Sequence, residues 1–199
     1  MIHTIQVDRV LHETVRLPYR DLVTRPTGVA VRNRIERLLA DADCSTARLD
    51  FSAVGLIDFS CADEVVAKLI LAVGRESGCY LLLQGLGEHQ AEAIDQVLER
   101  RSLAVAATQS TGEPLLLGRA DEDVRAAFGQ LYARGRSGAE AGAGGDDDGA
   151  GAGDGASDLA SALEWSVERA TEALMALSLL RLVIADGSHY RPLPFPQHS

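Results

Sequence analysis

The chain has 199 residues, 46% of them apolar, which predicts a globular domain with a small appendage and excludes a wholly disordered protein. A formal net charge of −10 disfavours nonspecific binding to nucleic acid or to an anionic membrane. The three cysteines lack C-x-x-C spacing, and no stretch resembles a signal peptide or an apolar span of ~20 residues, so we expect a cytoplasmic protein without disulfides, metal or cofactor.

Strand and helix patterns alternate along residues 1–136. Short stretches with the apolar content of strands are Thr14–Leu17, Ala47–Phe51, Cys79–Gln84, Leu103–Ala107 and Pro114–Leu117. Stretches with apolar residues at helical spacing are Gly28–Ala42, Cys61–Gly74, Glu88–Arg101 and Asp121–Arg134. This alternation predicts an α/β domain, a sheet with helices packed on it and right-handed crossovers between strands.

Residues 137–157 are nearly all Gly, Ala and Asp. Such a segment has too little apolar surface to offset the entropy lost on ordering, so we expect a flexible, disordered acidic linker. The linker separates the α/β domain from a C-terminal piece, residues 158–199. That piece predicts a helix or helix pair over Asp158–Trp165 and Ser166–Ile184, followed by a β-hairpin.

The dipeptide Asp186-Gly187 predicts the turn of that hairpin, because it suits backbone with positive φ. A helix followed by a hairpin resembles the last helix and wing of a winged helix-turn-helix module. The C-terminal piece has about half the usual length of such a module. The helix carries only two arginines against Glu168 and Glu172, whereas a DNA reader needs a basic face. We therefore expect a protein-contact or dimerisation element, anchored by Trp165 and Tyr190, in preference to a DNA-binding one.

The most informative segment is RLDFSAVGLIDFSCADEVV, residues 48–66, which predicts a buried strand, a tight turn and the start of a helix. Ser60 is expected to cap that helix, with Asp63 at the capping-box position and Glu64 beside it. Cys61 at a helix start suggests either a redox thiol of lowered pKa or a small buried residue, and we favour burial.

This segment resembles the STAS domain family of anti-sigma factor antagonists, in which a strand leads through an I-D-S-S-G type sequence into the second helix. Asp58 falls on the family's aspartate, and Ser60 falls on the serine that a partner kinase phosphorylates. The order of elements fits over about residues 10–135. Phe59 replaces a serine and Cys61 a glycine, so the resemblance supports a partner-binding STAS-like fold more strongly than a phosphorylation switch.

The resemblance implies a non-enzymatic signalling module that binds a protein partner, an anti-sigma factor of histidine-kinase type, and releases it when Ser60 is phosphorylated. The expected contact residues are Asp58, Phe59, Ser60, Cys61, Asp63 and Glu64. Helix capping alone is the competing explanation of Ser60. A transcriptional regulator that binds DNA through the C-terminal piece is the alternative function, and an enzyme lacks a convergent set of catalytic groups.

Overall fold

The computed structural model describes residues 1–15, 20–42, 45–76, 78–141 and 155–194. Two compact units divide this part of the chain, the first unit at residues 1–119 and the second unit at residues 120–194. The boundary predicted after residue 136 is therefore misplaced, because helix α6 (Glu122–Ala141) packs with helices α7 (Ala156–Leu163) and α8 (Val167–Leu179) of the second unit.

The predicted linker, residues 137–157, is also shorter at both ends than expected. Residues 137–141 form the end of α6, and residues 156–157 begin α7. The stretch between them, residues 142–154, lies outside the described residues.

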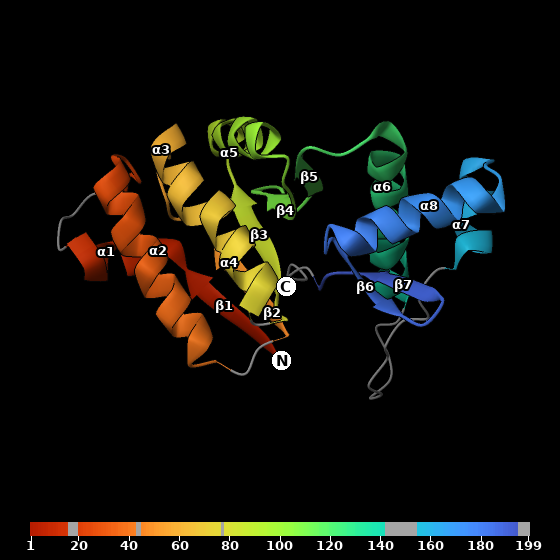
Figure 1. Cartoon of the computed structure of the whole chain (residues 1–199), viewed down its shortest axis with the longest axis horizontal. Coiled ribbons are helices and arrows are strands. Elements are labelled where there is room, and N and C mark those ends of the chain that lie inside the picture. Colours follow the sequence, from red (N-terminus) through yellow and green to blue (C-terminus); the bar gives the residue numbers. More distant parts are fainter. Residues whose placement is uncertain (16–19, 43–44, 77, 142–154, 195–199) are drawn as a thin grey trace. The chain divides into compact units, whose positions relative to one another are not determined.

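A five-stranded sheet is the centre of the first unit (Figure 1). The strands lie side by side in sequence order: β1 (Ile2–Gln6), β2 (Thr46–Asp50), β3 (Tyr80–Leu86), β4 (Ala104–Gln109) and β5 (Pro114–Gly118). The first four are parallel, and β5 pairs antiparallel with β4. The prediction of an α/β class is thus confirmed, with a mostly parallel sheet.

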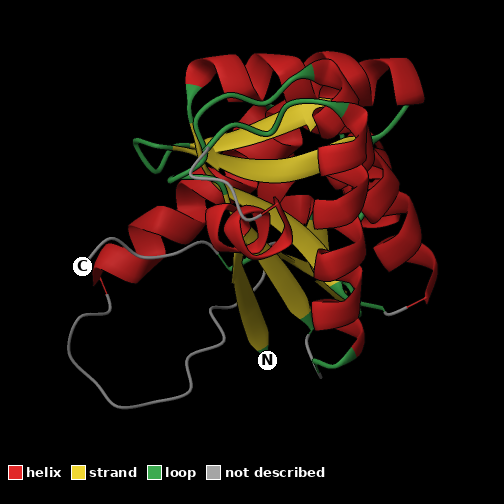
Figure 2. Ribbon diagram, turned by 90° about the vertical axis from the view of Figure 1, so that its left-hand side faces the viewer, coloured by secondary structure: helices red, strands yellow, loops and turns green. Residues whose placement is uncertain are grey.

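The helices that connect the strands form a row against this sheet, as their labels in Figure 1 show, and Figure 2 shows helices and strands from a second side. They are α1 (Val7–Val15), α2 (Arg25–Ala40), α3 (Phe59–Cys61), the π-helix η1 (Ala62–Ala67), α4 (Lys68–Glu76) and α5 (Glu88–Arg101). Helix α1 contacts α2, α2 contacts η1, and η1 contacts α5. When parallel strands follow in sequence order, crossovers of one hand place their helices on the same face of the sheet.

The prediction of a strand over Thr14–Leu17 was wrong. Residues 14 and 15 belong to α1, whose buried residues Val7, Val10 and Leu11 follow helical spacing, and residues 16–17 lie outside the described residues. The first strand is β1, and it pairs along its whole length with β2. Its five residues gain their structure from that long-range pairing, which local sequence patterns do not report.

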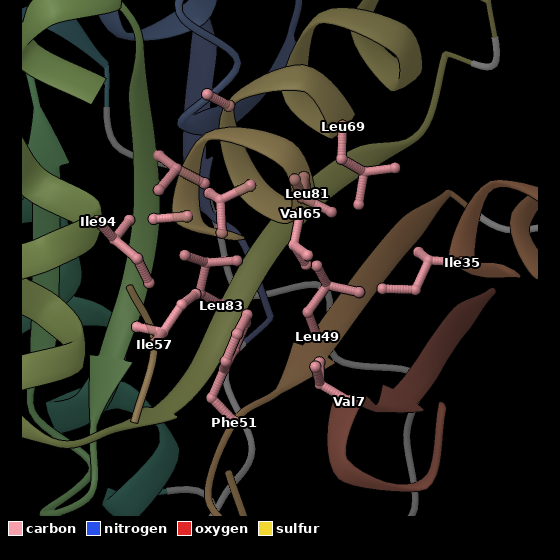
Figure 3. Packing of buried hydrophobic residues seen from close by; sticks show 14 of the residues in the cluster. Val7, Ile35, Leu49, Phe51, Ile57, Val65, Leu69, Leu81, Leu83 and Ile94 are labelled. Carbon is pink, nitrogen blue, oxygen red and sulfur yellow. The ribbon is translucent and has the colours of Figure 1, made fainter. Parts of the chain in front are cut away.

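A single hydrophobic core fills the space between the helices and the sheet (Figure 3). Side chains from the helices, such as Ile35 and Val65, point toward Leu49 on β2 and Leu83 on β3, and all four are fully buried. Each such side chain contributes about 1.5–3 kcal/mol on leaving water, so this core is the main source of stability in the first unit.

Strand β5 ends at a glycine that the backbone requires. Gly118 has φ +89°, and a Cβ atom there would lie 2.1 Å from the carbonyl oxygen of Leu103. Its N–H donates to Asp95 Oδ1 at 2.6 Å, which fixes the end of the strand against α5. Any side chain at this position would have to displace backbone.

The second unit combines helices α6, α7 and α8 with a two-stranded hairpin, β6 (Val183–Asp186) and β7 (His189–Pro192). Tyr132 of α6 is buried at the centre of this unit, where its hydroxyl donates to the Leu182 carbonyl at 2.9 Å and accepts from Leu193 N–H at 3.1 Å. Burial raises the pKa of Tyr132, so the hydroxyl remains a neutral donor and acceptor.

The predicted helix pair and hairpin are present, with shifted boundaries. Helix α8 ends at Leu179, five residues before the predicted end, because Arg181 adopts φ 58° and the Leu182 N–H turns back to Leu177 O at 2.9 Å. The hairpin turn is Gly187-Ser188, one residue later than expected, and of these two only Gly187 has positive φ, as in a type II′ turn.

Within the described ranges, no helix is both long enough and apolar enough to cross a membrane.

Candidate functional site

The segment that carries the STAS resemblance lies just beyond the carboxyl end of β2, beside a second segment of chain. Leu22 and Ile57 form an isolated parallel bridge, in which Leu22 N–H donates to Leu56 O at 2.7 Å and Asp58 N–H donates to Leu22 O at 3.0 Å. Both bridged side chains are buried. The bridge therefore holds the turn before α3 in one position against the start of α2.

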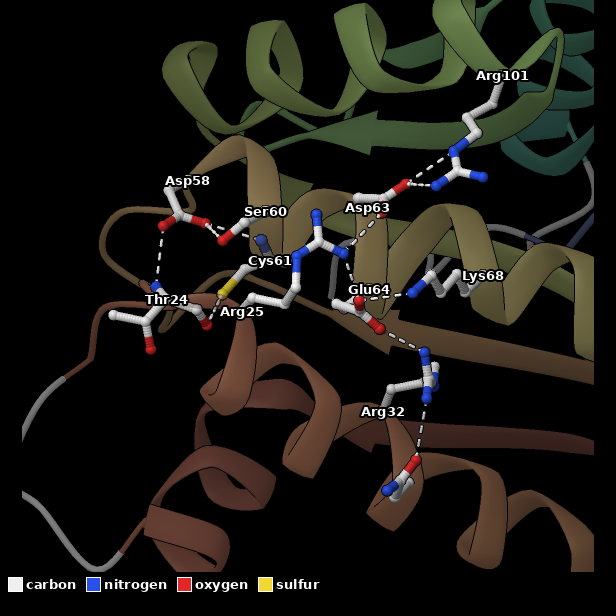
Figure 4. Close-up of polar contacts among 11 residues, drawn as sticks. Thr24, Arg25, Arg32, Asp58, Ser60, Cys61, Asp63, Glu64, Lys68 and Arg101 are labelled. Carbon is white, nitrogen blue, oxygen red and sulfur yellow. Dashed lines mark hydrogen bonds and ion pairs between the residues drawn. The ribbon is translucent and has the colours of Figure 1, made fainter.

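Asp58, and not Ser60, is the N-cap of the helix that follows. Its Oδ1 accepts from Cys61 N–H at 2.7 Å and from the Ser60 hydroxyl at 2.8 Å, while its Oδ2 accepts from Thr24 N–H at 2.9 Å (Figure 4). The predicted capping role of Ser60 was thus wrong, because the helix begins at Phe59 and Asp58 precedes it. Ser60 is half-buried, and its hydroxyl is a donor to the cap.

The carboxyl group of Asp58 is ionised at neutral pH. Partial burial opposes ionisation, but the backbone N–H groups of Thr24 and Cys61 and the Ser60 hydroxyl outweigh it, so the pKa of Asp58 lies below its ordinary value. Both carboxylate oxygens hold a hydrogen bond from a backbone N–H. Asp58 is therefore a fixed negative charge immediately beside the Ser60 oxygen.

Cys61 is fully buried, as the sequence predicted in preference to a redox role. Its thiol donates to Thr24 O at 3.1 Å. Burial, together with the nearby charge of Asp58, raises the pKa of Cys61 to about 12. The thiolate that redox chemistry requires is consequently scarce at neutral pH.

Asp63 and Glu64 are also buried, in an ion cluster between three helices (Figure 4). Glu64 pairs with Lys68 Nζ at 2.6 Å, with Arg25 Nη1 at 2.6 Å and with Arg32. Asp63 pairs with the same Arg25 nitrogen at 3.3 Å and with Arg101 at 2.6 Å. We call these six residues the ion cluster. It links α2, the helix that Asp58 caps, and α5.

The ion cluster keeps Glu64 charged although its side chain is only 2% exposed. Burial disfavours the charged form, but hydrogen bonds from Lys68 and Arg25 exceed that penalty, so the pKa of Glu64 lies below its ordinary value. Close approach of α2 makes the pairing possible, since a Cβ on Gly28 would lie 3.0 Å from Glu64 Cβ. Two of the predicted partner-contact residues are therefore structural.

Three exposed apolar side chains lie on the two bridged segments or directly before Ser60 in the chain. The exposed fractions are 42% for Val23, 57% for Leu56 and 50% for Phe59. Side chains alternate along extended chain, so Val23 and Leu56 point away from the buried pair that forms the parallel bridge. We call Val23, Leu56, Phe59 and Ser60 the turn patch.

The structure thus separates the six predicted contact residues into two groups. Asp58, Phe59 and Ser60 reach the surface, whereas Cys61, Asp63 and Glu64 are buried beneath it. Sequence reasoning missed the exposed residues Val23 and Leu56 and the four cations of the ion cluster. The pairing of Lys68 could have been predicted from the sequence, because Glu64 and Lys68 are spaced i, i+4 on a helix.

Among the residues that the structure describes, no three His, Cys, Asp or Glu side chains gather closely enough to hold a metal ion. A scan against protein-family models finds no match to the chain, and a search of curated proteins finds none either.

Proposed function

We propose that the first unit is a non-enzymatic regulatory module that binds a protein partner through the turn patch, in the manner of a STAS-like anti-sigma factor antagonist. The observation that carries the proposal is the exposure of Val23, Leu56 and Phe59 on the two bridged segments that meet at Asp58, whose carboxylate holds Thr24, Ser60 and Cys61. Exposed apolar side chains that cluster on a fixed backbone are typical of protein-contact sites.

Phosphorylation of Ser60 would act on this surface by charge. The hydroxyl now donates to Asp58, and a phosphoryl group would replace that donor with ~ −1.5 to −2 charges beside an ionised carboxylate. The start of the helix offsets only part of this repulsion. A partner that fits an apolar patch around a neutral hydroxyl would then lose affinity.

The test is a pull-down with the whole chain as bait, followed by measurement of affinity for the captured partner. We expect a histidine-kinase-like anti-sigma factor to bind, with at least tenfold weaker binding for Phe59→Asp and for Ser60→Glu. Ser110→Glu is the matched control, because Ser110 is exposed after β4 and lies outside the turn patch. Equal binding of wild type, F59D and S60E would refute the proposal.

A second candidate function is favoured by the second unit. Helices α7 and α8 are joined by the three residues 164–166, and the hairpin β6–β7 follows, which is the order of a winged helix-turn-helix module. With α6 included, the unit has three helices, one more than the predicted C-terminal piece, because the sequence analysis placed the helix over Asp121–Arg134 in the main domain. This arrangement supports a transcriptional regulator, which would be tested by a salt-dependent mobility shift on DNA.

A further inference from the structure

Arg25, the first residue of α2, runs alongside the helix turn that carries Ser60. The residue before it, Thr24, donates its N–H to Asp58 at 2.9 Å, and Asp58 accepts the Ser60 hydroxyl at 2.8 Å. At the other end of its side chain, Nη1 of Arg25 contacts both carboxylates of the ion cluster, at 2.6 and 3.3 Å. Because Ser60 lies between Asp58 and those carboxylates in the chain, the Arg25 side chain passes beside it (Figure 4).

The guanidinium of Arg25 is within reach of a group attached to the Ser60 oxygen. Ser60 and Glu64 are four residues apart, and side chains at this spacing leave the helix about 5–6 Å from one another. Arginine carries five N–H donors in a planar fork that matches two phosphate oxygens at once. Among the described residues, the hydrogen bonds of the Arg25 side chain are made by Nη1 alone, so its other donors can bind a phosphate.

Arg25 is also the cation that the ion cluster can release at the lowest cost. Its side chain is 55% exposed, whereas the other three cations of the cluster are 18–43% exposed. Without Arg25, Glu64 keeps two cations and Asp63 keeps Arg101. No buried carboxylate is then left unpaired, which is the outcome that makes breaking a buried ion pair costly.

We propose that Arg25 is the ligand of the phosphoryl group in the Ser60 switch. When Ser60 is phosphorylated, the Arg25 guanidinium moves from the two carboxylates to the phosphoryl oxygens and holds the phosphate against this chain's own helix. The inference rests on the proposed function, which supplies the phosphorylation of Ser60. The phosphate carries more charge than either carboxylate, and charge-assisted bonds from arginine to phosphate are strong.

The phosphorylation step removes the contact that now holds the Ser60 oxygen. The kinase transfers the γ-phosphoryl group of ATP to Ser60 Oγ, the hydroxyl proton is lost and ADP leaves, so Ser60 no longer donates to Asp58. The phosphate, with ~ −1.5 to −2 charges, is repelled by the ionised Asp58 and attracted by Arg25. Asp58 precedes Ser60 and the guanidinium lies beyond it, so both forces move the phosphate in the same direction.

The test titrates the phosphate of the whole chain by phosphorus NMR, with phosphoserine incorporated at position 60 during translation, so that neither kinase nor partner is needed. The second pKa of phosphoserine is ordinarily about 6. In the phosphorylated chain it should lie about one unit lower than in the phosphorylated Arg25→Gln variant, because a cation in contact favours the dianion. Arg25→Lys keeps the charge but lacks the planar fork, and its phosphate pKa should lie between these two.

Arg34→Gln is the matched control, because Arg34 is also an arginine of α2 in an ion pair, with Glu13, outside the ion cluster. Its phosphate pKa should equal that of the unsubstituted phosphorylated chain. Hydrogen exchange of the β3 amides establishes that each variant is folded. A phosphate pKa that is the same with and without Arg25, or that rises equally in R34Q and R25Q, would overturn the assignment of Arg25.

That failure is distinguishable from failure of the proposed function, because the pull-down and the affinities of F59D and S60E are measured on chains without phosphate. Equal partner binding by wild type, F59D and S60E refutes the proposed function, whatever the phosphate titration gives. Weaker binding by both variants, together with a phosphate pKa that is independent of Arg25, supports the proposed function and overturns this inference alone.

Discussion

Replacing Glu64 by glutamine should destabilise the first unit by an amount that the ion cluster allows us to estimate. Removing one partner of a fully buried ion pair costs about 3–5 kcal/mol. Two of the three cations paired with Glu64 are 36% and 55% exposed and can return to water, and the third, Arg32, keeps Glu36 at 3.3 Å. We therefore expect a smaller loss, about 2–3 kcal/mol, for Glu64→Gln.

Hydrogen exchange of the β3 amides is the suitable assay, because these central amides report unfolding of the first unit alone. A loss of about 2–3 kcal/mol corresponds to exchange about 30- to 150-fold faster than in wild type. The matched control is Glu36→Gln, which removes a carboxylate from the same Arg32 at a site 38% exposed and should change stability by less than about 0.5 kcal/mol.

The difference between wild type and E64Q should also depend on pH in one direction. The folded pKa of Glu64 is lowered from an ordinary value near 4.5, so its stabilisation is fully present above that value. The difference should narrow as the pH falls below 4.5 toward the folded pKa. Equal costs for the two glutamines, or a difference that grows on acidification, would refute the ion cluster as a stabilising unit.

Three further outcomes follow from local geometry. Cys61 should react with iodoacetamide at pH 8 about a thousandfold more slowly in the folded chain than in urea, because folding raises its pKa from 9.0 to about 12. Labelling of the folded chain at the rate of a free thiol would contradict this. Gly118→Ala should cost more than about 2 kcal/mol by urea unfolding, whereas Gly129→Ala, in open space on α6, should stabilise by about 0.5–1 kcal/mol. Tyr132→Phe should destabilise the second unit by about 1–3 kcal/mol, because it leaves the buried Leu193 N–H and Leu182 carbonyl without their partner. Trp165 fluorescence reports the unfolding of this unit, and an unchanged unfolding midpoint would argue against that hydrogen-bond network.

The elements with strong apolar periodicity were predictable from the sequence, and those that depend on distant partners were not. Helix α5 has the bounds predicted, Glu88–Arg101, because its apolar face and flanking residues are local signals. Strand β1 was missed because its structure comes from pairing with β2, forty residues later. The end of α8 was missed because an arginine, and not a glycine, takes the left-handed position at residue 181.

The local structure of the candidate site was predicted only in part. The start of a helix close to Asp58 and the burial of Cys61 follow from the local pattern of apolar and polar residues. The burial of Asp63 and Glu64 does not, since it requires arginines from α2 and α5 that only the fold brings to them. From the sequence alone, two carboxylates near the start of a helix are equally well explained as exposed residues that favour the helix N-terminus.

The π-helical turn η1 makes this part of the chain tolerant of the loss of one residue. A π turn holds one residue more than the α-helical turns on either side, and all six residues of η1 are buried. Removing one residue between 62 and 67 would restore regular α-helical bonding and would leave the remainder of the helix close to its present rotation, because the π turn holds the one residue that is lost. Leu69 and Val73 would then stay in the core, whereas a deletion within α4 would rotate the residues that follow by about 100° and move Val73 out of it.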